Sequence, residues 1–278
     1  MHISIFDQYG ALNSPPVFSA FRQGLNQLGI AYSSNNMSAD VAVIWSMLWA
    51  GRMRPNQAVW QHYRSQSKSV IVLEVGMLDR GRTWKLGVNG VNNQGWFGND
   101  IQPGRAVMLG LKLKPWTNTG THIIIAPQRS DSEQWANKPS VQDWLQDTVK
   151  NIRQHSNRPI MIRPHPRQRI DLIPGVTIQH PIKLVGQSDA YDFDIKLSQA
   201  WAVVNDSSGP GSQAIIAGVP AFVGVDSLSA PVANLDLAQI ENPLRPDRTA
   251  WLDRLAHTEW TIEEIATGRP FARLLAGL

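Results

Sequence analysis

Cysteine is absent from this chain of 278 residues, so neither a disulfide bond nor a thiolate metal site can form. Long apolar runs are also missing, because none approaches the roughly 20 residues that a membrane-spanning helix requires. The N-terminal stretch contains no basic segment followed by an apolar one, so the pattern predicts no export signal. Charged residues are 17% of the chain against 42% hydrophobic residues, a balance that excludes a disordered protein. We therefore expect a globular, cytoplasmic protein with no membrane partner.

The charge balance is mildly basic, with 26 Lys and Arg against 22 Asp and Glu. The cations gather in two segments, one holding Arg80, Arg82 and Lys85 and the other holding arginines from Arg153 to Arg169. With eleven tryptophans in the chain, these segments favour a surface for phosphates and rings. Solvated cations and core tryptophans explain the same composition, so composition alone leaves both interpretations open.

Strand-like and helix-like patterns alternate along the first half. Continuous apolar runs occupy 41–45 and 69–76, and the stretch 15–29 has helical spacing with two prolines at its start. Runs that are apolar throughout are typical of strands buried on both faces of a parallel sheet. Residues 79–113 are rich in glycine, asparagine and arginine, so we expect loops there.

The second half repeats the alternation. Strands are expected at 121–127, 158–166, 201–205 and 219–224, and helices at 140–155, 190–200 and 211–218. Alternation in both halves is the mark of α/β units, so we predict an α/β fold with two Rossmann-like domains facing a cleft. The predicted domains are 1–115 and 116–278. The pattern leaves open whether the helical tail after residue 245 crosses back to the first domain.

The stretch "VVNDSSGPGSQAIIAG" at 203–218 joins an expected strand to an expected helix. Ligands of open α/β sheets lie beyond the carboxyl ends of the strands, where helix N-termini present unpaired N–H groups. Ser207 and Ser208 can cap the helix and donate to an anion, while Gly209 and Gly211 allow a ligand to approach the backbone. A plain capped helix after a tight turn explains the residues too. The stretch matches neither a P-loop nor the dinucleotide fingerprint.

A second motif, "IMIRPHPRQR" at 160–169, places His165 directly after another strand. Pro164 and Pro166 fix the backbone on both sides of this histidine. A rigid, exposed imidazole beside Arg163 and Arg167 is suited to an anionic ligand.

His165-Pro166, followed about forty residues later by Ser207-Ser208 and "AGVPAFV", resembles the C-terminal halves of bacterial sialyltransferases and capsule Kdo transferases. The pattern is also similar to phage-encoded glycosyltransferases. The first two families are GT-B glycosyltransferases, which are metal-independent and inverting. The resemblance implies that residues 116–278 bind a UDP- or CMP-linked sugar donor and that residues 1–115 form the acceptor side. The expected donor-binding residues are Arg163, His165, Asn205, Ser207, Ser208, Gly209, Gly211, Ser212 and Gln213.

The segment "LEVGMLDR" at 73–80 resembles the "E-D-G-F-x-R" segment of the capsule enzymes, which carries an acidic catalytic base. Val75 stands where the family has aspartate, so the base is Glu74 or Asp79. An inverting transfer needs such a carboxylate to take the acceptor proton, and donors to stabilise the departing phosphate. Asp192-Phe193-Asp194 matches a metal-binding pattern superficially, but acids at a helix start favour the helix dipole, so we expect no metal cofactor.

The sequence indicates the acceptor less directly than it indicates the donor site. The basic segments, the tryptophans and the unanchored chain favour a hydroxymethylated pyrimidine in phage double-stranded DNA, flipped out of the helix. A surface polysaccharide or lipopolysaccharide is the alternative, and a non-catalytic nucleic-acid-binding α/β protein is the third hypothesis. The expected acceptor-binding residues are Arg80, Arg82, Lys85, Arg167 and Arg169.

Overall fold

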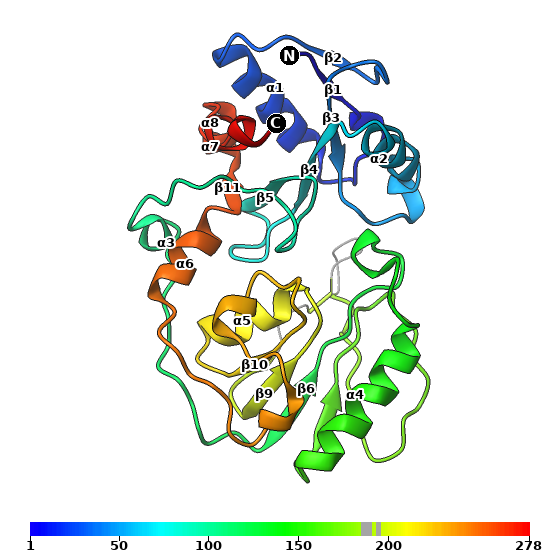
Figure 1. Cartoon of the computed structure of the whole chain (residues 1–278), viewed down its shortest axis with the longest axis vertical. Helices are drawn as coiled ribbons and strands as arrows, with labels where there is room; N and C mark the ends of the chain where they lie inside the picture. The colour runs from blue at the N-terminus through cyan, green and yellow to red at the C-terminus, as the bar shows by residue number, and fades with distance from the viewer. Residues whose placement is uncertain (185–190, 193–195) are drawn as a thin grey trace. The chain divides into compact units, whose positions relative to one another are not determined.

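The computed structural model describes residues 1–184, 191–192 and 196–278, and its contacts divide the chain into two compact units. Unit 1 contains residues 1–111 and 252–278, and unit 2 contains residues 112–251. The chain therefore leaves unit 1 once and returns to it within helix α6, Thr249–Ala256. Figure 1 shows the elements of both units.

Unit 1 is built on a six-stranded sheet in the order β11-β5-β4-β3-β1-β2. Strands β1 to β4 run parallel in their pairs, whereas β5 is antiparallel to β4 and to β11. The strand bounds are β1 Ile3–Ile5, β2 Tyr32–Ser34, β3 Val41–Trp45, β4 Ser69–Val75, β5 Thr83–Val88 and β11 Glu259–Thr261. The region 79–113 was expected to form loops, and this expectation is wrong for β5 and for the short helix α3, Arg105–Met108.

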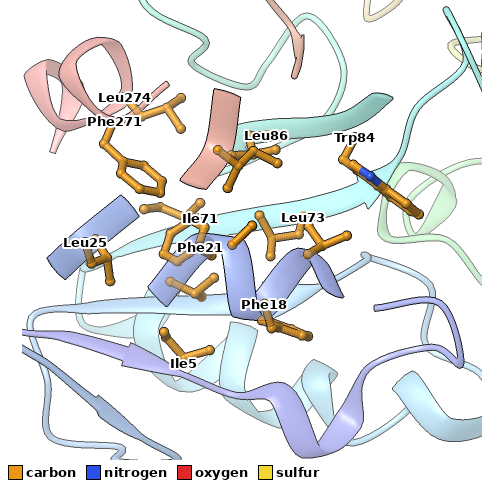
Figure 2. Close-up of a cluster of buried hydrophobic side chains, with 14 of the residues drawn as sticks. Ile5, Phe18, Phe21, Leu25, Ile71, Leu73, Trp84, Leu86, Phe271 and Leu274 are labelled. Carbon is orange, nitrogen blue, oxygen red and sulfur yellow. The ribbon is translucent and has the colours of Figure 1, made fainter. Parts of the chain in front are cut away.

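Helices cover both faces of this sheet. Strand β3 is apolar throughout and β4 is apolar from Val70 to Leu73, so successive side chains need partners on opposite faces. Helix α1, Pro15–Gln27, packs Phe18, Phe21 and Leu25 on one face, together with Phe271 and Leu274 from α8, Phe271–Leu274 (Figure 2). Helix α2, Asn56–Ser65, covers the other face, and α7, Ile262–Ala266, packs beside α1.

Unit 2 is built on a five-stranded parallel sheet in the order β10-β9-β6-β7-β8. Its elements are β6 His122–Ile125, α4 Val141–His155, β7 Ile160–Ile162, β8 Thr177–Ile178, β9 Ala200–Val204, α5 Gly209–Ile216 and β10 Ala221–Phe222. Leu145 and Ile152 of α4 pack against the apolar strands β6 and β7 to form the core.

Both units also contain short 3-10 helices, at Asp7–Tyr9, Gly51–Met53, Glu133–Trp135, Ala230–Val232, Leu237–Gln239 and Leu275–Gly277.

The predicted α/β class is confirmed, since each unit holds a sheet whose strands are mostly or entirely parallel. The helix expected at 190–200 is wrong where the chain is described, because residues 196–199 are not helical and Ala200 begins β9. Phe193 and Asp194 of the aspartate motif lie outside the described residues.

Candidate functional site

Three loops of unit 2 meet at one edge of its sheet. Strand β6 lies between β9 and β7, and all three are parallel, so their carboxyl ends point the same way. The Ser207 hydroxyl, after β9, donates to Gln128 Oε1, after β6, at 3.0 Å. The Ser130 N–H in turn donates to Gln168 Oε1, in the loop after β7, at 2.9 Å. The edge therefore brings the Ser-Ser segment and the His-Pro segment to the same central loop.

The turn from β9 into α5 is tied together by Asn205. Its side-chain amide donates to the Ser208 carbonyl at 2.8 Å and to the Ser208 hydroxyl at 3.3 Å. Ser208 is the N-cap of α5, and the first helical turn presents backbone N–H groups beside it. A Cβ on Gly211 would lie 2.4 Å from Asn205 Oδ1, so only glycine fits this packing. The turn is thus a rigid concentration of N–H and hydroxyl donors, which suits an anion.

The remaining predicted residues of α5 lie at the same end. Gly209 is the first residue of the helix, and Gln213 is partly buried on its second turn. Ser212 is buried, and its hydroxyl lies 2.5 Å from that of Ser229. Ser212 therefore joins α5 to the 227–229 turn.

An ion pair next to the serines was missed by sequence reasoning. Asp206 is only 8% exposed, and Lys138, which precedes α4, forms a short salt bridge with it. The same ammonium lies 3.9 Å from Asp226. Lys138 therefore offsets a buried negative charge beside the donor groups of Ser207. The signal was hidden because the pairing joins positions that are far apart in the sequence.

His165 has a defined tautomer. Its Nδ1 accepts the Arg167 backbone N–H at 3.1 Å, so the proton of the neutral ring is on Nε2. The imidazole is partly buried between the two prolines. Nε2 is therefore the donor nitrogen of the neutral ring.

The arginines of this segment differ in their surroundings. Arg163 is buried and holds Asp192 through a 3.1 Å ion pair and a 2.5 Å bond to its carbonyl. The Ile182 N–H and then Arg163 keep the pKa of the Asp192 carboxyl below its usual value. Arg167 and Arg169 are exposed. Arg158 is engaged elsewhere, because it pairs with Glu241 at 3.0 Å and stacks over Trp201.

In unit 1, Glu74 is held at the end of β4. Its Oε2 accepts the Ser46 hydroxyl at 2.6 Å, and its Oε1 accepts the Val75 N–H at 2.8 Å. Ser46 adopts a left-handed backbone with φ of 65°, which is strained for a residue with a side chain. Such strain is typical of positions where the surrounding structure fixes a functional group.

The other predicted residues of unit 1 lie on the turn after β4 and on β5. Asp79 pairs with Arg82 at 3.1 Å, and Arg80 is exposed. Lys85 is only partly exposed and lies opposite Glu74 in the sheet. Burial lowers the pKa of Lys85, and the nearby carboxylates of Glu259 and Glu74 oppose that change. The five expected residues of unit 1 thus belong to one turn and two neighbouring strands, whereas the donor-binding set belongs to unit 2.

Among residues 1–184, 191–192 and 196–278, no group of three His, Asp or Glu side chains is placed to hold a metal ion. Within the same ranges, every helix is too short or too polar to cross a bilayer.

No protein-family model matches the chain, and no curated protein matches its sequence. Among solved structures, it is similar to the beta Kdo 2,7 transferase of Thermosulfurimonas dismutans KpsC, with a TM-score of 0.52 and 15% identity over 100% of both chains. It is also similar to the beta Kdo 2,4 transferase of the same KpsC, with a TM-score of 0.51 and 12% identity over 93% of this chain and 90% of that one. The likeness to Kdo transferases expected from the His-Pro and Ser-Ser motifs is thereby confirmed for the fold.

Proposed function

We propose that this protein is a glycosyltransferase that moves a sugar from a nucleotide-sugar to a hydroxyl group. One observation carries the proposal: the Ser-Ser turn, the N-terminus of α5 and the His-Pro loop meet at the carboxyl edge of the unit 2 sheet. This edge is where α/β folds bind phosphates. The fold shared with two Kdo transferases makes a sugar donor the best match for that anion site.

The donor phosphate is assigned to the N-terminus of α5. The Ser208 hydroxyl, the first backbone N–H groups of the helix and the Nε2 proton of His165 are hydrogen-bond donors, and the Ser207 hydroxyl becomes one when it turns from Gln128 to the phosphate. They offset the negative charge that develops on the phosphate as the glycosidic carbon–oxygen bond breaks. Lys138 keeps the Asp206 carboxylate from repelling that charge. We expect neither a metal nor another cofactor to be required.

The general base is assigned to Glu74, with Asp79 as the second candidate. The acceptor oxygen bonds to the anomeric carbon on the face opposite the departing phosphate, and its proton passes to the carboxylate, so the configuration inverts. Each Glu74 oxygen accepts one hydrogen bond, which leaves further acceptor capacity for the hydroxyl. Asp79 is already paired with Arg82, which makes it the weaker candidate.

A saccharide hydroxyl is the favoured acceptor. Both of the Kdo transferase structures described above share this fold, and Arg82, one of the cations expected to bind DNA, pairs with Asp79 of this chain. The alternative, hydroxymethylated pyrimidine in phage DNA, depends on the exposed Arg80, Arg167 and Arg169. The non-catalytic nucleic-acid-binding alternative predicts DNA binding without any transfer.

The test is a mass-spectrometric screen of UDP- and CMP-linked sugars, including CMP-linked Kdo, against a free oligosaccharide, hydroxymethylated duplex DNA and unmodified duplex, with EDTA present. Transfer to the oligosaccharide that is insensitive to salt supports the proposal. Transfer to the modified duplex supports the DNA alternative, in which log affinity falls with log salt at about −0.9 per neutralised phosphate. Absence of transfer to all three acceptors from every donor overturns the proposed function.

Two variants assign the roles. His165→Ala should weaken nucleotide affinity by roughly tenfold to a hundredfold, because it removes one hydrogen bond to a charged group. His155→Ala is the control, since that exposed histidine lies at the C-terminus of α4. Glu74→Gln should lower turnover by roughly 10²- to 10⁴-fold and leave donor binding intact. Normal turnover in Glu74→Gln would move the base to Asp79.

A further inference from the structure

Three charged residues form one row across three neighbouring strands of unit 1. Lys85 of β5 lies opposite Glu74 of β4 on one side and Glu259 of β11 on the other. Directly opposed side chains share one face of a sheet. Two residues back along β4, Val72 packs in the α2 cluster, so the row projects from that face. A lysine therefore lies between two carboxylates at the end of the sheet that carries the proposed base.

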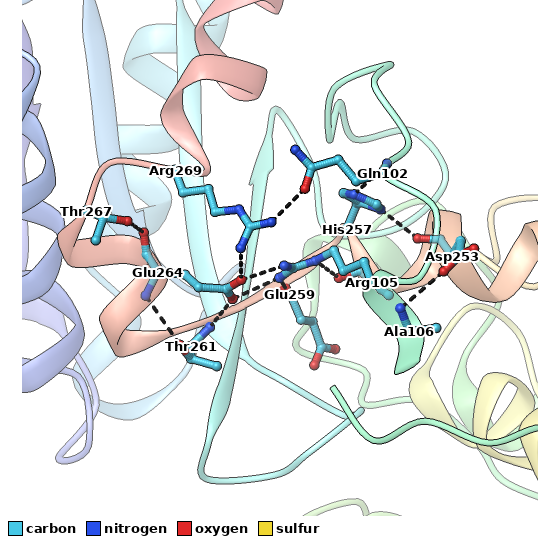
Figure 3. A network of polar contacts seen from close by, with 11 residues as sticks. Gln102, Arg105, Ala106, Asp253, His257, Glu259, Thr261, Glu264, Thr267 and Arg269 are labelled. Atoms are coloured by element: carbon cyan, nitrogen blue, oxygen red, sulfur yellow. Dashed lines mark hydrogen bonds and ion pairs between the residues drawn. The ribbon is translucent and has the colours of Figure 1, made fainter. Parts of the chain in front are cut away.

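Glu259 is the unexplained member of the row. Its side chain is fully buried, at 0% exposure, and points away from the neighbouring Arg105–Glu264 pair (Figure 3). Its Oε1 accepts the Met77 N–H at 2.8 Å, and its Oε2 accepts the Leu78 N–H at 3.0 Å. Consecutive backbone N–H groups that converge on one anion are a recurrent binding arrangement. Here a carboxylate of the same chain occupies it.

The contact is tight and extends to Asp79. The Thr83 hydroxyl donates to Glu259 Oε2 at 2.7 Å, and the Asp79 N–H lies 3.2 Å from the same hydroxyl oxygen. A Cβ on Gly76 would lie 2.5 Å from Glu259 Oε2 and 2.3 Å from the Thr83 carbonyl oxygen. The turn after β4 is therefore packed directly on the Glu259 carboxylate, and it begins only two residues after Glu74.

We propose that Glu259 is a positioning residue of the transfer reaction, which fixes the turn 76–79 and the Lys85 ammonium beside Glu74. The inference rests on the proposed function only for the role of Glu74. A carboxylate without partners is too costly to bury, and the three hydrogen bonds and the Lys85 cation offset that cost for Glu259. Its links to the turn and to Lys85 keep Glu74 in one orientation.

The test begins with Glu259→Gln, which keeps the shape of the side chain but removes its charge. The new NH₂ group faces donors that formerly bound an oxygen, so the turn loosens. We expect kcat to fall by roughly ten- to a hundredfold, because a small misplacement of a reacting group has an effect of that size. The donor KM should stay unchanged, because the proposed donor contacts are in unit 2. Glu263→Gln is the matched control, since it removes an exposed carboxylate four residues along the chain. Thr83→Val removes only the hydroxyl link and serves if Glu259→Gln does not fold.

Two readouts do not need activity. Amide hydrogen exchange at Met77 and Leu78 should become faster in Glu259→Gln and stay unchanged in Glu263→Gln. An NMR titration of ¹³C-methylated lysines should show a lower pKa for Lys85 in Glu259→Gln, because the Glu259 carboxylate raises that pKa. Faster exchange and a lower Lys85 pKa together with an unaltered kcat would overturn the positioning role and show that Glu259 has only a structural role. Unaltered exchange and an unaltered Lys85 titration would overturn the proposal altogether. If the wild-type protein transfers no sugar, the proposed function fails, and these two readouts still decide whether Glu259 holds the turn and Lys85.

Discussion

Replacing Arg105 with methionine tests the buried polar network of unit 1 (Figure 3). The guanidinium is 1% exposed and makes bonds of 2.6 and 2.9 Å to the two Glu264 oxygens. It also donates to the carbonyls of Ala256 at 2.8 Å and Glu259 at 2.7 Å, and it lies 3.9 Å from the Trp260 ring centre. Methionine fills most of the volume of the stem but satisfies none of these acceptors.

The expected loss follows from what is left behind. In Arg105→Met, the Glu264 carboxylate still pairs with Arg269 at 3.0 Å and accepts the Thr261 N–H at 3.1 Å, so its negative charge stays compensated. The two buried carbonyls lose their Arg105 bonds. Each buried carbonyl left without its partner costs about 1–3 kcal/mol, and with the lost Glu264 contact we expect the free energy of unfolding of unit 1 to fall by about 3–5 kcal/mol. Arg269→Met is the control: it removes a partly exposed cation from the same Glu264, which is worth no more than about 1 kcal/mol.

Native-state hydrogen exchange measures this loss separately for each unit. The slowest amides of β3 and β4 should exchange roughly 140- to 4,000-fold faster in Arg105→Met, since each 1.4 kcal/mol is a factor of ten. Amides of β6 and β9 in unit 2 report on whether the effect is local. An acceleration below about tenfold in β3 and β4, or equal effects of Arg105→Met and Arg269→Met, would refute the reasoning.

Three further outcomes are expected. His257 accepts the Gln102 N–H through Nε2, and burial holds the pKa of this histidine below its usual value. The contribution of neutral His257 to stability is therefore present above the unfolded pKa of about 6.5 and is lost as pH falls through the folded pKa. In chemical denaturation, the free energy of unfolding of His257→Gln should depend less on pH over that range than that of the wild type. Gly211→Ala should weaken donor binding in calorimetry, because its Cβ would collide with Asn205 Oδ1 in the turn before α5; unchanged affinity would remove this turn from the donor site. Lys138→Met should weaken nucleotide affinity by leaving Asp206 unpaired, and adding Asp206→Asn should restore much of it; a double variant as weak as the single one would contradict the charge argument.

The local sequence pattern was sufficient to predict those strands and helices that consecutive residues mark. The apolar runs at 41–45 and 69–75 are strands, and prolines mark the first turns of α1 and α5. The meeting of the His165 and Ser207 loops at one sheet edge also follows from parallel strands. Strand β5, "TWKLGV", was missed because Thr83, Lys85 and Gly87 separate its apolar side chains, so no continuous apolar run marks it.

The pairings that complete the candidate site could not be read from the sequence. Glu259 reaches Met77 across 182 positions, and Lys138 reaches Asp206 across 68. Each depends on sheet register or loop placement that only the folded chain defines. The assignments of Glu74, His165 and the serines to catalysis and donor binding stay predictions until the variants are measured.

The discontinuity of unit 1 has a consequence for how the protein is made. Unit 2 is continuous, so all of its contacts can form once residue 251 has left the ribosome. Unit 1 must instead keep the edge of β5 open, and part of the apolar face of α1 uncovered, until β11, α7 and α8 are synthesised. The nascent chain thus exposes an unpaired strand edge throughout the synthesis of unit 2, a period in which chaperone binding or off-pathway strand pairing competes with completion of the sheet.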